Sequence, residues 1–218
     1  MTISTKHYID LKYAISDCLQ RDNWSTLFEL CRTNDVEISK TIAAIFSLYD
    51  PKNEWKFIDY VASLKPDERL HKWESIATVC YILGKIGANN IKKAIADLKT
   101  FLMENHMLRP AVSAALSNLW VVNSKVTAGT IYNSWIAKSG GNEDLQEVAV
   151  NSCDYLARNE PKLAAGFLKK VSRLKNRDIS SDIAIGMVEN YLIDRHSSRN
   201  VKTKHKVKGK KKTQKKIR

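Results

Sequence analysis

The fold is decided by residues 76–101, which read IATVCYILGKIGANNIKKAIADLKTF. The first part of this stretch has apolar residues at the i, i+3, i+4, i+7 spacing of one helical face: Ile76, Val79, Cys80 and Leu83. Gly84 and Gly87 follow, as expected where a helix ends and the chain turns. A second apolar stripe then runs through Ile91, Ala94, Ile95, Leu98 and Phe101. The stretch therefore predicts two helices joined by a short turn.

Three sets of apolar residues repeat this unit along the chain. The anchor leucines are separated by 35, 36 and 37 residues: Leu48, Leu83, Leu119 and Leu156. Two sets on the second helices are spaced by 37, 37 and 36 residues: Phe57, Ala94, Ile131 and Phe167, and Val61, Leu98, Trp135 and Val171. Apolar positions that recur in phase at this period indicate a stacked repeat protein rather than one closed core. A shorter first unit from about Tyr8 to Arg32 and a closing helix from Ile183 to Ile193 complete the expected stack.

Two helices per repeat of this length resemble the HEAT and armadillo class of repeat proteins, and the resemblance covers residues 8–193. It implies an all-α fold, a right-handed α-solenoid of about five helix pairs plus a closing helix, with the second helices along a concave face. The expected division is a solenoid domain at residues 1–197 and a disordered Lys/Arg-rich tail at residues 198–218.

The positive charge is concentrated in the tail. Of the 36 Lys and Arg residues, 11 fall between Arg199 and Arg218, where there is no Asp or Glu, so the other 198 residues carry 25 basic and 23 acidic side chains. A segment this polar and this charged is expected to be disordered in isolation, and a polyanion relieves its self-repulsion. The predicted phosphate contacts in the tail are Lys202, Lys204, Lys206, Lys208, Lys210, Lys211, Lys212, Lys215, Lys216 and Arg218. The alternative is a solubility tail without a partner.

The fifth unit adds basic residues to the second-helix surface: Lys162, Lys169, Lys170 and Arg173. Earlier second helices have Asp59 or Asp97 near the corresponding positions, so basic character should increase toward the C-terminus. These four side chains are predicted nucleic-acid contacts, and the alternative is an ordinary solvated helix face.

Several classes of protein and site are not expected. No apolar run approaches the roughly 18 residues of a membrane-spanning helix, and the N-terminal residues do not form a signal peptide. The histidines and cysteines lack metal-ligand spacing, and no phosphate-binding glycine loop or GxSxG motif is present. Cys80 and Cys153, at matching repeat positions, are expected to be buried thiols. No metal, cofactor or catalytic residue is predicted.

The leading functional hypothesis is a non-enzymatic adaptor or scaffold that binds a nucleic acid or a protein on its concave face. Its basic tail would contact DNA or RNA phosphates without sequence specificity. The expected location is cytoplasmic or nucleoid-associated, or nuclear in a eukaryotic host. One alternative, by resemblance, is a HEAT-like DNA glycosylase of the alkylation-repair type, with Asp97 and Trp135 as its candidate residue types. Another is a scaffold for proteins only, localised by its tail. Trp55 and Trp120, at helix ends or turns, are alternative candidates for exposed binding aromatics.

Overall fold

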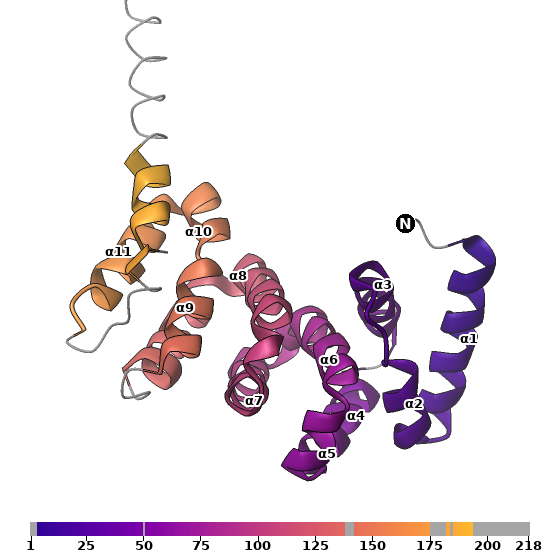
Figure 1. The fold of residues 1–218 in the computed structure, drawn as a ribbon. Helices are drawn as coiled ribbons and strands as arrows, with labels where there is room; N and C mark the ends of the chain where they lie inside the picture. The colour runs from indigo at the N-terminus through magenta and orange to yellow at the C-terminus, as the bar shows by residue number, and fades with distance from the viewer. Residues whose placement is uncertain (1–3, 50, 138–141, 175–181, 184, 194–218) are drawn as a thin grey trace, which may run out of the picture.

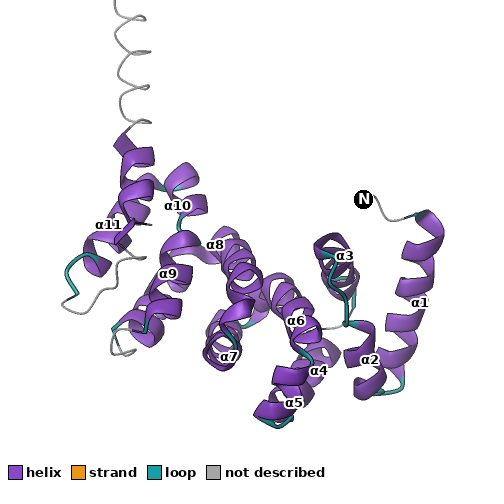
Figure 2. Cartoon of the chain, in the orientation of Figure 1, coloured by secondary structure: helices purple, strands orange, loops and turns teal. Residues whose placement is uncertain are grey.

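The protein was analysed as a computed structural model that describes residues 4–49, 51–137, 142–174, 182–183 and 185–193. Within these residues the secondary structure is helical and contains no strand (Figure 2), which confirms the all-α prediction. The predicted tail contacts from Lys202 to Arg218 lie outside the described residues. No helix in the described part of the chain is long and apolar enough to cross a bilayer.

The helices follow one another in chain order along a curved, elongated body, from α1 at one end to α11 at the other (Figure 1). Their bounds are α1 Thr5–Gln20, α2 Trp24–Leu30, α3 Val36–Phe46, α4 Pro51–Ser63, α5 Pro66–His71, α6 Trp73–Ile86, α7 Ile91–Glu104, α8 Arg109–Ile131, α9 Glu143–Asn151, α10 Asp154–Asn159 and α11 Pro161–Val171. Two 3-10 turns, η1 Gly87–Asn89 and η2 His106–Leu108, and a π-helical turn, η3 Tyr132–Ile136, join them. Residues 185–193 are also helical, as predicted.

Side-chain caps explain where many of these helices begin. The Asp35 carboxylate accepts hydrogen bonds from the backbone N–H groups of Glu37 (2.8 Å) and Ile38 (3.2 Å), which confirms Asp35 as the predicted N-cap of α3. Asn23, Asn90 and Asn142 cap α2, α7 and α9 in the same way. Each cap satisfies backbone donors that have no partner within the helix.

A break inside α8 creates the predicted helix pair of the fourth unit. Asn123 has non-helical backbone angles (φ −156°, ψ 87°), and its side chain accepts a hydrogen bond from the Val126 N–H at 3.1 Å. The hydroxyl of Thr127 donates across the break to the Leu119 carbonyl at 3.0 Å. The residues after Asn123 therefore start a second helix, which continues into η3. Sequence reasoning missed two further breaks, the short helix α5 and the interruption between α9 and α10.

The burial predicted for the apolar sets on the second helices is confirmed. All eight members of the two predicted sets are buried, from Phe57 and Val61 in α4 to Phe167 and Val171 in α11. Among the anchor leucines, Leu83, Leu119 and Leu156 are buried, but Leu48 is 62% exposed, so its assignment to the core was wrong. The cause is the length of α3, which ends at Phe46; Ile45 and Phe46 supply its last buried side chains.

The cysteines are all buried and free, in agreement with the prediction for Cys80 and Cys153. Burial raises the pKa of both thiols well above the ordinary value. The two side chains therefore stay protonated at neutral pH and act as small apolar groups.

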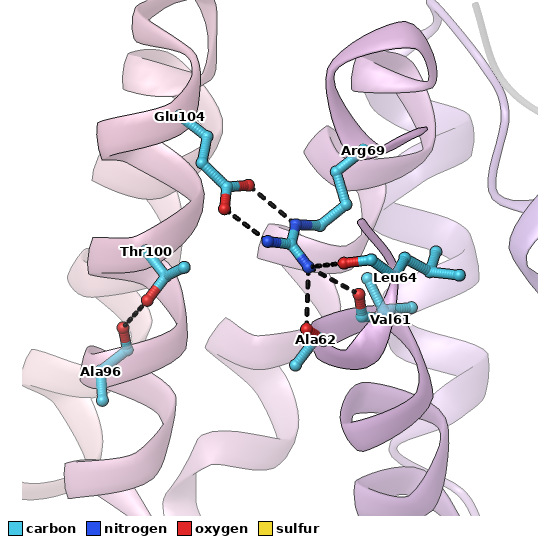
Figure 3. A network of polar contacts seen from close by, with 7 residues as sticks. All are labelled: Val61, Ala62, Leu64, Arg69, Ala96, Thr100 and Glu104. Carbon is cyan, nitrogen blue, oxygen red and sulfur yellow. Dashed lines mark hydrogen bonds and ion pairs between the residues drawn. The ribbon is translucent and has the colours of Figure 1, made fainter. Parts of the chain in front are cut away.

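A buried arginine joins three helices in the N-terminal half (Figure 3). Arg69 of α5 is 6% exposed, and its guanidinium donates to Glu104 of α7 through Nε (2.8 Å) and Nη2 (2.5 Å). Its remaining nitrogen, Nη1, donates to the carbonyls of Ala62 (2.8 Å), Leu64 and, more weakly, Val61 (3.4 Å). Those carbonyls lie at the end of α4, where the helix supplies few N–H donors; the Val61 carbonyl also accepts the Leu64 N–H at 3.3 Å. Arg69 therefore caps α4 and binds it to the end of α7.

Further polar contacts connect positions about one repeat apart. The hydroxyls of Ser39 and Thr78 are 2.9 Å apart between α3 and α6. The Trp120 indole N–H donates to the Ser152 hydroxyl at 2.9 Å. Trp120 is 1% exposed and packs edge-on against Phe167, with ring centres 5.7 Å apart, so its interpretation as an exposed binding aromatic was wrong.

Helices α6 and α8 cross closely at Gly84. A Cβ atom added there would lie 2.7 Å from the Cα atom of Ala115, so α6 and α8 touch backbone to backbone. Only glycine permits this approach, because any side chain would push the helices apart.

We expect Leu119→Ala to lower the free energy of unfolding by about 2–5 kcal/mol, since it removes a fully buried side chain from between helices. Leu48→Ala makes the same chemical change at the exposed anchor position and should cost less than about 0.5 kcal/mol. Urea denaturation followed by circular dichroism measures both. Equal losses in the two variants would contradict the burial difference between these leucines.

Arg69→Met should lower the free energy of unfolding by about 3 kcal/mol, because it leaves the Glu104 carboxylate and the α4 carbonyls without their donor. The matched control is Lys40→Met, which breaks the exposed 2.8 Å pair with Glu37 and should leave the denaturation midpoint nearly unchanged. An Arg69→Met variant as stable as the control would show that the buried pair does not hold α4 to α7.

Candidate nucleic-acid interface

A groove of about 260 Å³ lies between the second half of α8, η3 and α11. Its lining combines three lysines, one tyrosine and a small apolar floor: Lys125, Ala128, Gly129, Tyr132, Lys162, Leu163, Gly166, Phe167 and Lys170. The groove therefore brings two of the predicted site residues, Lys162 and Lys170, together with Lys125.

Helical spacing explains why these residues share one groove. On the α8 side, residues 125, 128, 129 and 132 follow the i, i+3, i+4, i+7 pattern of a single helical face. On α11, residues 162, 166 and 170 are each one turn apart. The helix that starts after the break at Asn123 continues into η3, which contacts α11, so the first of these faces lies alongside α11.

Two glycines keep the floor of the groove open. A Cβ atom added to Gly129 or to Gly166 would meet no heavy atom within 4 Å. Neither glycine is therefore required by helix packing, in contrast to Gly84. Both positions leave space that a ligand can enter.

The lysines that line the groove are exposed cations without an ion-pair partner among the described residues. Lys125, Lys162 and Lys170 are exposed, and none has a carboxylate within ion-pair distance among the residues that the structure describes. The Lys170 ammonium lies 5.2 Å from the centre of the Tyr132 ring, within the range of a cation–π contact. The carboxylate of Glu160, two residues before Lys162, accepts a hydrogen bond from the Ser124 hydroxyl at 2.6 Å.

Tyr132 is held by neighbouring contacts of η3. The buried Trp135 indole donates to the Ile95 carbonyl of α7 at 3.2 Å. Lys99, also on α7, donates to the Ser134 carbonyl at 2.6 Å. These two bonds fix the short π-helical turn against the preceding unit. The backbone that carries the Tyr132 ring, one wall of the groove, is therefore held in place.

The N-terminal second helices provide a contrasting surface. Lys93 of α7 lies 5.2 Å from the centre of the Trp55 ring, but its ammonium also pairs with Asp59 (2.9 Å) and Asp97 (3.0 Å). Burial lowers the pKa of Lys93, but the hydrogen bonds to both carboxylates outweigh it and leave that pKa raised. Asp97 and Lys170 occupy the same repeat position, three residues after Ala94 and Phe167. The lysine beside the aromatic ring is therefore neutralised in this unit, whereas its counterpart Lys170 has no ion-pair partner among the described residues.

A second groove has an arginine that is paired with carboxylates. It has a volume of about 460 Å³ and lies beside η2, the start of α8 and α9. Its arginine, Arg109, pairs with Asp144 and, at 2.8 Å, with Glu147. An anion entering there would have to displace two carboxylates. Electrostatics therefore favour the lysine groove for a negatively charged ligand.

The remaining predicted site residues lie outside the groove. Lys169 is exposed on α11 and Arg173 is exposed just beyond its end, but neither lines the groove. Lys125 and Tyr132 were missed, because sequence reasoning placed Lys125 in a turn and Tyr132 among apolar residues. Their spacing of seven residues on one helix was the available signal.

The two residues considered for a glycosylase do not form a site. Asp97 is paired with Lys93, and burial raises the pKa of its carboxyl although the lysine opposes this change. Trp135 is fully buried and cannot stack against a base. Neither lines the lysine groove.

The arrangement provides cations, an aromatic ring and an open apolar floor, which together suit the binding of an anion with a flat apolar part. Within the described residues, no group of three His, Cys, Asp or Glu side chains is placed to hold a metal ion.

Comparison of the chain with protein-family models, curated proteins and solved structures found no match.

Proposed function

We propose that this protein is a non-enzymatic α-solenoid adaptor that binds nucleic acid through the lysine groove between α8 and α11. The observation that carries the proposal is that Lys125, Lys162 and Lys170 line one groove and have no carboxylate partner in the part of the chain that the structure describes. Closely placed ammonium groups repel one another, and a phosphate backbone relieves this repulsion and releases its condensed counterions.

The solenoid part of the proposal is supported by the separation of the contacts between helices. Side-chain links join residues 39 apart (Ser39 and Thr78), 35 apart (Arg69 and Glu104) and 40 apart (Ile95 and Trp135). A repeat protein in which each unit packs on the next one predicts contacts at this separation. The resemblance to the HEAT and armadillo class remains a prediction from the repeat period.

The basic tail extends the proposed interface beyond the groove. Its 11 cations follow residues 185–193, the closing helix, in the sequence. Phosphate contacts of this kind position a protein without reading bases, so we propose binding that is independent of sequence.

Charge reversal tests the groove. We expect Lys125→Glu, Lys162→Glu and Lys170→Glu together to weaken binding to a fluorescent oligonucleotide by on the order of tenfold or more at ~150 mM salt, with a salt slope shallower by about 2–3. The matched control is Lys12→Glu, Lys65→Glu and Lys85→Glu, which makes the same charge change at exposed lysines outside the groove. Equal losses in the two triple variants would show that total charge, and not the groove, governs binding.

Removing residues 199–218 tests the tail separately. For the full chain we expect a slope of log K against log salt of about −4 to −7, because a flexible arm seldom engages all of its charges with phosphates. The truncated chain should bind with a shallower slope and keep the melting temperature of the full chain. Unchanged affinity after truncation would exclude the tail as a phosphate contact and leave the groove alone.

A further inference from the structure

We infer that the lysine groove accepts one unstacked nucleotide of a single-stranded nucleic acid, with its base against Tyr132 and its phosphates among the three lysines. This inference rests on the proposed function and specifies which form of nucleic acid the groove takes.

The size and floor of the groove suit a single base. The volume of about 260 Å³ is close to that of one nucleotide and well below that of a duplex segment. The floor includes Ala128, Gly129 and Gly166, and the space above both glycines is free of protein atoms for 4 Å. A flat ring can lie over such a surface. The bases of a duplex stay stacked inside the helix, so a duplex offers the groove only its phosphates.

Tyr132 adds the aromatic surface that single strands require. Proteins that bind single strands combine a positively charged groove with aromatic rings on which bases stack. Here the ring and the charge are in contact, since the Lys170 ammonium is 5.2 Å from the ring centre. Lys170 is exposed and flexible, so it can leave the ring for a phosphate when a base arrives.

The lysines of the groove come from both of the helices that line it. Lys125 is two helical turns before Tyr132 on α8, and Lys162 and Lys170 are two turns apart on α11. A nucleotide whose base reaches Tyr132 therefore has cations available for the phosphates on either side. An acidic peptide would match the charge, but its carboxylates have no flat apolar group to place over the glycine floor.

The test uses the full chain and three fluorescent probes: an oligothymidylate of about a dozen nucleotides, a duplex of the same length and an oligoglutamate of similar charge. We expect Tyr132→Ala to weaken binding of the single strand by roughly 5- to 100-fold and to leave duplex binding within about twofold. Tyr132→Phe keeps the ring and should retain the wild-type preference for the single strand.

A second pair of variants keeps the test decisive if Tyr132→Ala is unstable. Gly166→Leu fills the groove without removing a charge, and it should reproduce the selective loss of single-strand binding. Gly186→Leu is the matched control, because Gly186 is also helical with free space around its Cβ position and does not line the groove.

The outcomes separate this inference from the proposed function. Equal losses for single strand and duplex, or no loss in either groove variant, would overturn the single-strand inference while nucleic-acid binding itself stands. Oligoglutamate binding that is as tight as the single strand and equally sensitive to Gly166→Leu would assign the groove to acidic peptides. Wild-type protein that binds none of the nucleic-acid probes would overturn both proposals.

Discussion

The described structure depends on contacts between helices that are not consecutive in the chain, above all between α3 and α6 and between α6 and α8. The polar bonds follow the same rule: Ser39 binds Thr78, Trp120 binds Ser152, and Trp135 binds a carbonyl of the preceding α7. Each of these bonds satisfies a buried polar group that would otherwise be unpaired. Because they join neighbouring units, they set the position of one unit relative to the next as well as its stability.

Two contacts show how closely the units are fitted. Gly84 lets the backbones of α6 and α8 touch, which leaves no tolerance for a side chain at that crossing. Arg69 instead links α4 to α7 through a long side chain. Its five donors fit the Glu104 carboxylate and the carbonyls at the end of α4. The N-terminal half is therefore held by a rigid crossing and a buried ion pair. The groove between α8 and α11 has neither: its glycines face open space, and its lysines have no carboxylate partners among the described residues.

The two Lys–aromatic contacts differ in whether carboxylates neutralise the lysine. Lys93 beside Trp55 and Lys170 beside Tyr132 have the same 5.2 Å geometry, but only Lys93 is neutralised by Asp59 and Asp97. A cation held by two carboxylates has little affinity left for a third anion, whereas an unpaired one retains it. Binding of an anionic ligand is therefore favoured at the C-terminal end of the body, which is also the end from which the basic tail continues.

The sequence by itself determined the helical class, the repeat period and the buried sets on the second helices, because apolar residues at helical spacing have few alternatives to burial. The sequence also predicted Lys162 and Lys170 as site residues, and both line the lysine groove, since the charged residues of α11 can be read directly from the sequence. Only the tertiary structure decided that Leu48 is exposed, that Trp120 is buried and that Lys125 and Tyr132 face α11. These facts depend on where α3 ends and where α8 breaks. The first boundary is at Phe46 and the second at Asn123. An apolar pattern that extends over several helical turns does not locate such a boundary to a single residue.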